Sequence, residues 1–165
     1  MKKLLFIFAF ALISMLFMGC PYGSDVPIDK TPSVKIDANL IGVWSPTGFD
    51  STSTYTVSKT DDYNYLIKKE STTGNETTVT KYKAFLSDAG GKTFINIWAD
   101  DDSQTPKYYF YRLGWSADNK QLTMYEVTDN IKEAFTSSDD LKKFIKDNCS
   151  LSFFYNKDTV AYSRK

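Results

Sequence analysis

From Leu40 to the end, the chain alternates short segments rich in β-branched and aromatic residues with clusters of Gly, Asp, Asn and Ser. The first kind of segment favours strands and the second favours tight turns. Seven strands are predicted before residue 128, at about 41–46, 53–59, 62–70, 76–87, 92–99, 106–115 and 120–127. Because only a few residues separate them, each strand should pair antiparallel with the next in a meander.

The segment 106–115 has aromatic residues at both alternating sets of positions. One face would carry Tyr109, Tyr111, Leu113 and Trp115. The opposite face would carry Tyr108 and Phe110. A strand that is apolar on both faces should be central or covered on both sides.

Beyond residue 127 the pattern changes to a helical one. A helix is predicted over 137–148, because Ser137 or Ser138 can cap its first turn and apolar residues recur at helical spacing. A helical turn is expected at 130–135, and two final strands at 150–155 and 159–164.

The strand count sets the fold class, since eight or nine strands can close a small barrel and remove the exposed sheet edges. The predicted fold is mainly β. We expect a single antiparallel up-and-down meander barrel of 8–9 strands, with one helix near the C-terminus.

The first nineteen residues have the composition of a secretory signal peptide. A basic start at residues 1–3 precedes an apolar run over residues 4–18, whose only polar side chain is that of Ser14. The run is shorter than the roughly 20 apolar residues that a membrane-spanning helix needs.

The run ends in Gly19-Cys20, a small residue directly before a cysteine. This resembles the lipobox of bacterial lipoproteins, in which the cysteine thiol is diacylated and the chain is then cut before it. Phe17 and Met18 stand where that family usually has Leu and a small residue. The resemblance implies a chain that starts at Cys20 and is anchored by acyl chains in the bacterial cell envelope, facing the periplasm or the cell surface. The alternative is an ordinary signal or a single-pass anchor with a coincidental cysteine.

Residues 20–38 are expected to form a tether. Three of the five prolines in the chain lie in this stretch, which shows no apolar periodicity. The folded domain is therefore expected to occupy residues 39–165.

Charge and cysteine content narrow the class of protein. Loss of Lys2 and Lys3 with the signal leaves 18 of the 20 basic side chains against 20 acidic ones. This balance gives no electrostatic case for binding nucleic acid, which would need a basic face. With Cys20 acylated, Cys149 has no partner for an intramolecular disulfide, and we interpret it as a small buried apolar residue.

The first predicted strand contains Gly42-Val43-Trp44. It is similar to the opening strand of the lipocalin and lipocalin-like group, which carries Gly-x-Trp. The resemblance implies that Trp44 closes one end of the barrel, that Gly42 lets the chain bend beneath it, and that a basic side chain from a late strand covers the indole. Arg112 and Arg164 are both candidates for that side chain.

The usual catalytic constellations are missing from the sequence. The chain contains no histidine, which removes Ser/His and Cys/His nucleophile activation and the commonest zinc ligand. The stretch 100–102 is acidic but lacks the spacing of a calcium loop. We therefore expect no enzyme, no catalytic residues, no cofactor and no metal.

Two binding hypotheses remain. In the first, the barrel holds a small apolar ligand, which aromatic side chains contact in its mouth. The residues proposed for this are Tyr63, Tyr65, Trp98, Tyr109 and Tyr111. In the second, the barrel core is solid and the domain binds an envelope protein or a glycan through outward-facing Tyr108, Phe110 and Trp115.

Overall fold

The computed structural model describes residues 21–48, 52–101 and 105–165. The signal peptide and the acylated Cys20 lie outside the described residues, so both stay predictions. None of the helices in the described part of the chain is long and apolar enough to cross a membrane.

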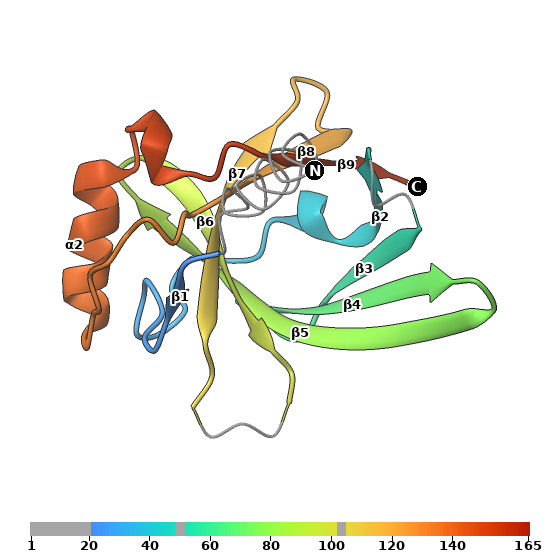
Figure 1. Ribbon diagram of the computed structural model, residues 1–165, viewed down its shortest axis with the longest axis horizontal. Coiled ribbons are helices and arrows are strands. Elements are labelled where there is room, and N and C mark those ends of the chain that lie inside the picture. The colour runs from blue at the N-terminus through green and yellow to red at the C-terminus, as the bar shows by residue number, and fades with distance from the viewer. Residues whose placement is uncertain (1–20, 49–51, 102–104) are drawn as a thin grey trace, which may run out of the picture.

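Eight antiparallel strands form a closed barrel (Figure 1). They are β2 (Gly42–Thr47), β3 (Ser53–Lys59), β4 (Asn64–Thr73), β5 (Glu76–Ala89), β6 (Lys92–Ala99), β7 (Tyr108–Trp115), β8 (Gln121–Glu126) and β9 (Val160–Arg164). From β2 to β8 each strand pairs with the next, and β9 pairs with both β8 and β2. The predicted fold class is confirmed.

The connection between β5 and β6 shows why local sequence determines this meander. Gly90 and Gly91 both have positive φ, of 60° and 71°. A two-residue hairpin with positive φ at both positions matches the right-handed twist of its strands, and glycine adopts it at little steric cost. A Cβ on Gly90 would also lie 2.5 Å from the Sγ of Cys149, so the chain after the helix packs against this turn.

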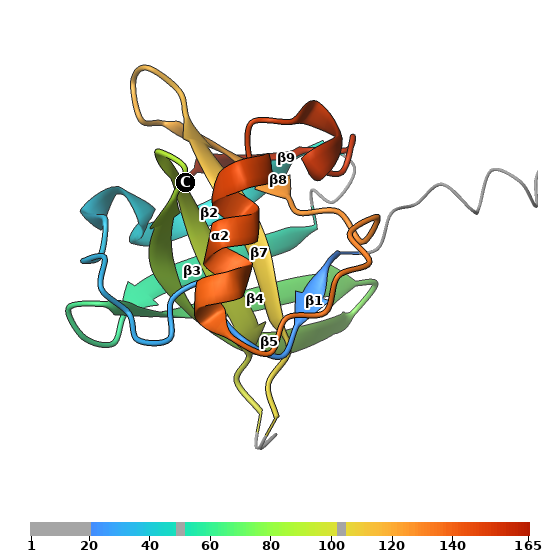
Figure 2. The same ribbon diagram turned by 90° about the vertical axis from the view of Figure 1, so that its left-hand side faces the viewer.

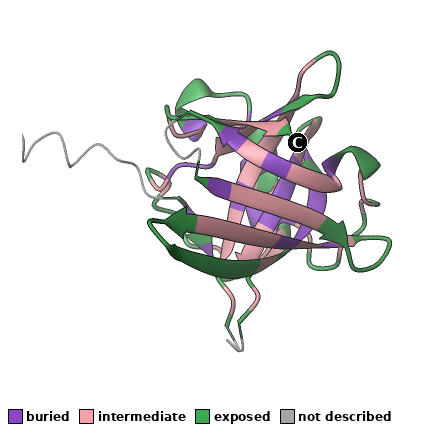
Figure 3. Ribbon diagram, turned by 90° about the vertical axis from the view of Figure 1, so that its right-hand side faces the viewer, coloured by how far each residue is buried: buried purple, intermediate pink, exposed green. Residues whose placement is uncertain are grey.

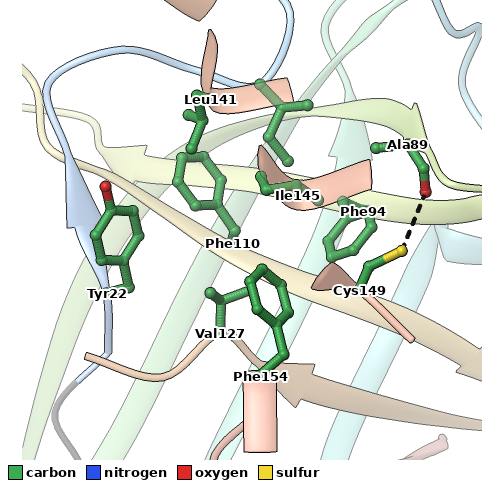
Figure 4. Close-up of a cluster of buried hydrophobic side chains, with 10 residues drawn as sticks. Tyr22, Ala89, Phe94, Phe110, Val127, Leu141, Ile145, Cys149 and Phe154 are labelled. Atoms are coloured by element: carbon green, nitrogen blue, oxygen red, sulfur yellow. Dashed lines mark hydrogen bonds between the residues drawn. The ribbon is translucent and has the colours of Figure 1, made fainter. Parts of the chain in front are cut away.

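The helix α2 (Ser138–Asn148) covers the outside of the barrel (Figure 2). Ser137 is its N-cap, with the side-chain oxygen accepting a hydrogen bond from the Asp140 backbone N–H at 3.2 Å. The buried face of the helix packs against outward-facing side chains of β5, β6 and β7 (Figure 4). The cluster contains Tyr22, Ile28, Ala89, Phe94, Phe110, Val127, Leu141, Ile145, Cys149 and Phe154, and we call it the outer cluster.

The outer cluster explains why β7 is aromatic on both faces. Phe110 is buried beneath α2, whereas Tyr109 and Tyr111 face the barrel interior. Cys149 is a buried free thiol, as interpreted from the sequence. On the opposite side of the barrel none of the described helices covers the strands, and the first half of β5 is exposed (Figure 3).

The prediction that residues 20–38 form a tether is wrong for residues 21–38, which pack on the barrel. Pro21 forms an isolated bridge with Thr128, and β1 (Gly23–Ser24) pairs antiparallel with the start of β7. Ile28 is 0% exposed in the outer cluster. The prolines exclude a helix, but they do not prevent an extended segment from lying on a sheet edge and burying the apolar residues between them.

A buried amide fixes this N-terminal segment to the barrel. The side-chain oxygen of Asn96, on the outer face of β6, accepts a hydrogen bond from the Ile28 backbone N–H at 2.9 Å. Its amide nitrogen donates to the Phe85 carbonyl at 3.2 Å and to the Ser87 hydroxyl at 2.9 Å. Asn96 is fully buried, so each of these bonds is shielded from water.

Two local predictions beyond β8 were wrong. The helical turn expected at 130–135 is not formed, and residues 131–135 have no regular structure. Ile131 and Phe135 instead pack against the outer cluster from an irregular segment. The strand expected at 150–155 is instead a short 3-10 turn, η3 (Ser152–Phe154), followed by an isolated bridge at Tyr155. Both edges of β8 are already paired, with β7 and β9, so this segment has no barrel edge on which to form a strand.

Replacement of Asn96 should show how much the N-terminal segment contributes to stability. In Asn96→Ala the Ile28 N–H is left buried without its acceptor, which should lower the free energy of unfolding by about 2–4 kcal/mol. Urea denaturation followed by tryptophan fluorescence measures the change. The exposed Asn130 provides the control, since Asn130→Ala should change it by less than about 0.5 kcal/mol. Equal effects of the two variants would contradict the role assigned to Asn96.

Candidate functional site: the barrel interior

The barrel encloses a cavity of about 270 Å³ that is partly open to solvent. Its walls come from the inward-facing positions of the strands and from Leu40, which precedes β2. The apolar wall residues are Leu40, Trp44, Val57, Ile67, Ile95, Ile97, Ala99, Leu113, Leu122 and Met124. The remaining wall residues are Lys69 and five tyrosines: Tyr55, Tyr82, Tyr109, Tyr111 and Tyr162.

Trp44 closes one end of the cavity. Its side chain is 2% exposed, and its indole N–H donates to the Leu40 carbonyl at 2.9 Å. The ring packs against Trp115 of β7, with centroids 5.9 Å apart. Leu40 belongs to a 3-10 turn, η2 (Ala38–Leu40), so the segment before β2 forms part of this closed end.

Arg164 is the basic side chain that covers Trp44. Its guanidinium carbon lies 4.8 Å from the centroid of the indole, and its Nη1 donates to the Ile41 carbonyl at 3.0 Å. Gly42, with φ of 143°, leaves room for it, since a Cβ there would lie 3.0 Å from Nη1. The other candidate, Arg112, lies over the ring of Tyr125 on the outside of the barrel.

Tyr65 holds the N-terminal segment over the same closed end. Its hydroxyl accepts a hydrogen bond from the Asp37 backbone N–H at 2.6 Å. Burial of the ring raises the pKa of this hydroxyl to about 12, so it stays protonated throughout the physiological range.

Tyr111 connects the cavity wall to a small hydrogen-bonded network with Glu126 and Asn156. The Tyr111 hydroxyl donates to Glu126 at 2.9 Å, and the other carboxylate oxygen of Glu126 accepts from the Asn156 amide at 2.7 Å. Burial, together with the Glu126 carboxylate, raises the pKa of Tyr111 well above its usual value. Because the Tyr111 proton is directed at Glu126, its oxygen retains lone pairs that can accept a hydrogen bond from a ligand.

Among the described residues that line the cavity, Lys69 supplies the one cationic side chain. Its ammonium nitrogen lies 5.5 Å from the centroid of the Tyr55 ring. That ring in turn packs edge-on against Tyr162, with centroids 5.4 Å apart. The wall therefore combines aromatic faces with a single positive charge, and the described residues that line it include no Ser, Cys, Asp or Glu.

The structure separates the five residues that the sequence suggested for ligand contact. Tyr109 and Tyr111 line the cavity. Tyr65 belongs to the core cluster inside the barrel but lies at its closed end, bound to Asp37. Trp98 packs between Phe85 and Tyr108 on the outside of the barrel, and Tyr63 lies in the exposed connection before β4, so neither of these two contributes to the cavity.

Four polar or aromatic wall residues were missed: Tyr55, Lys69, Tyr82 and Tyr162. The alternation of Tyr55 with Val57 could have signalled a shared face, but it does not indicate which face points inward. That choice depends on the register between neighbouring strands.

The aromatic surface patch proposed as the alternative is not formed. Phe110 is buried in the outer cluster, and Trp115 faces the interior against Trp44. Tyr108 is half-buried and packs on Trp98, with ring centroids 5.3 Å apart. These three residues therefore do not present a common outward face.

Within the described residues, no group of three or more His, Cys, Asp or Glu side chains could hold a metal ion. Comparison with known proteins found no match among protein families, curated proteins or solved structures.

The Tyr65 hydroxyl should make stability depend on alkaline pH. A raised pKa in the folded state stabilises the protein fully below pH 10, and this contribution is lost as the pH rises toward about 12. The difference in unfolding free energy between the native chain and Tyr65→Phe should therefore be constant up to pH 10. It should then fall by about 2 kcal/mol.

Urea denaturation at a series of pH values tests this expectation. Tyr63→Phe, which changes an exposed ring before β4, is the matched control and should leave the pH dependence unaltered. A constant difference up to a pH of about 12 would show that the hydroxyl does not have the raised pKa.

Proposed function

We propose that this chain is an acylated lipoprotein of the bacterial cell envelope whose barrel binds a small apolar or aromatic ligand in its interior. The observation that carries the ligand-binding part is the partly open cavity of about 270 Å³ with a mainly apolar wall. Small-molecule sites are typically concave and apolar, with a few polar groups that orient the ligand, and they measure about 300–1,000 Å³. This cavity lies just below that range, so it suits only a small ligand.

The cavity limits the class of ligand. A cavity of about 150 Å³ is enough for benzene, so the barrel has room for a molecule of one or two rings or a short aliphatic chain. The rings of Tyr55, Tyr109 and Tyr162 offer aromatic faces. The Tyr111 oxygen would accept a hydrogen bond from the ligand.

The alternative, an envelope interaction module with a solid core, has less support. Its proposed aromatic patch is dispersed between the outer cluster and the barrel interior. The interior also contains space that side chains do not fill.

The envelope part of the proposal rests on the sequence of the first twenty residues. A basic start, a short apolar run and Gly19-Cys20 together suggest export followed by acylation of Cys20. Anchoring by more than one acyl chain is stable, whereas a single chain gives marginal binding.

Native mass spectrometry tests ligand binding directly. The domain should begin at residue 21, because a start at 39 would remove Tyr22 and Ile28 from the outer cluster. Exposed to a lipid and metabolite extract of the producing cell, the domain should retain a small molecule that is lost on denaturation.

Blocking the cavity provides the specific control. Ala99→Trp places a large ring in the cavity wall at an exposed residue and should abolish the retained mass. Val79→Trp makes the same addition on exposed β5, away from the cavity, and should keep it. An apo mass for the native domain, or a ligand that survives Ala99→Trp, would contradict binding in the barrel.

Acylation is tested separately in the full chain. Cells supplied with an alkyne fatty acid should label the native protein and should not label Cys20→Ser, which lacks the thiol. Labelling of the variant would place the lipid elsewhere, and an unlabelled native protein would refute the anchor.

A further inference from the structure

Two apolar side chains stand out on the surface after α2. Phe153 is 73% exposed and Leu151 is 38% exposed. Phe153 is the most exposed large apolar residue in the described chain, since the next, Val79, is 46% exposed. The η3 turn produces this exposure, because Phe154 is directed into the outer cluster while its neighbour Phe153 points away.

This apolar pair lies close to the point where the described chain begins. The Thr128 backbone N–H donates to the Phe154 carbonyl at 3.1 Å, and Thr128 also bridges Pro21. Adjacent paired segments lie about 4.8 Å apart. Phe154 and Pro21 thus lie on either side of Thr128, on the order of 10 Å from each other.

No spacer residues separate this surface from Cys20, because Pro21 directly follows it in the sequence. Consecutive Cα atoms are about 3.8 Å apart, so the acylated residue would directly adjoin Pro21. The next residue is firmly held: the Tyr22 N–H donates to the Val127 carbonyl at 3.0 Å, and its hydroxyl donates to the Glu133 carbonyl at 2.9 Å. An anchor at Cys20 would therefore hold the barrel against the bilayer without a spacer.

We propose that Leu151 and Phe153 insert into the lipid bilayer beside the acyl chains of Cys20, so that the barrel lies on the membrane by one fixed face. This inference rests on the proposed acylation of Cys20. Apolar side chains at a membrane surface reach roughly 5–10 Å into the boundary between headgroups and acyl chains. They would add a second attachment close to the first.

The size of the surface favours lipid over a protein partner. A fully buried aromatic side chain covers about 150–250 Å², whereas a specific protein interface buries at least about 1,000 Å². Two side chains do not supply that area, but a bilayer needs no complementary surface.

Fluorescence quenching by brominated lipids tests the proposal on the full acylated protein. Phe153→Trp places a fluorophore on the proposed docking face, at an exposed position where the substitution leaves the core intact. Tyr63→Trp is the matched control: Tyr63 is 36% exposed and follows Asp62, whose carbonyl accepts from the Ile36 N–H at the closed end of the barrel. In Figure 2, η3 and β1 lie on one side of α2 and the β3–β4 connection lies on the other.

Both variants are reconstituted into vesicles of phosphatidylethanolamine and phosphatidylglycerol, with and without bromine on the upper acyl carbons. Trp44, Trp98 and Trp115 contribute the same background to each. In brominated vesicles the fluorescence contributed by the new tryptophan should be largely lost in Phe153→Trp and retained in Tyr63→Trp.

Each other result overturns the proposal in a distinguishable way. If the Phe153→Trp protein is acylated and bound to vesicles but its added signal is unquenched, the anchor is intact and the domain stands off the bilayer. A blue shift of that added signal without lipid, together with a doubled mass, would assign this surface to a second copy. Failure of acylation and of vesicle binding would remove the anchor, and the docked orientation with it.

Discussion

The pairing of β9 with both β2 and β8 is the interaction on which the rest of the structure depends. Its register places Arg164 opposite Trp44 and Tyr162 opposite Leu122. These pairs close the sheet, so neither β2 nor β8 is left with a free edge. They also bring Arg164 over the indole and Tyr162 into the cavity wall. Closure of the barrel and formation of the site are thus produced by the same short strand.

Closure also divides the aromatic residues between two environments. A strand in a barrel has one face inside and one outside, and in β6 and β7 both faces are used. Ile97 and Tyr109 face the cavity, while Phe94 and Phe110 face α2. The outer cluster anchors the helix and the N-terminal segment, so the interior does not need to be filled completely for the domain to have a core. A cavity can be tolerated because much of the apolar burial lies outside the barrel wall.

The sequence was sufficient for features that depend on neighbouring residues. The barrel strands and the helix after them follow from local preferences, and the structure confirms them and selects Ser137 over Ser138 as the cap. The sequence was insufficient where contacts between distant residues decide which way a side chain points. Trp98 and Tyr109 are both aromatic residues of predicted strands, yet register places one outside the barrel and the other in its wall. Only the closed barrel distinguishes Arg164 from Arg112 as the cover of Trp44.

The N-terminal segment shows the same limit and has the largest consequence for function. Its prolines indicate an extended chain, but Asn96, 68 residues beyond Ile28, determines that this chain lies on the barrel. Gly23 pairs with Tyr109, and a Cβ on Gly23 would lie 3.3 Å from the Tyr109 ring. Tyr109 also lines the cavity. Only two residues, Pro21 and Tyr22, therefore separate the proposed acylation site from a strand in contact with the cavity wall. Any force on the anchor would be transmitted to the barrel itself, because no flexible linker lies between them.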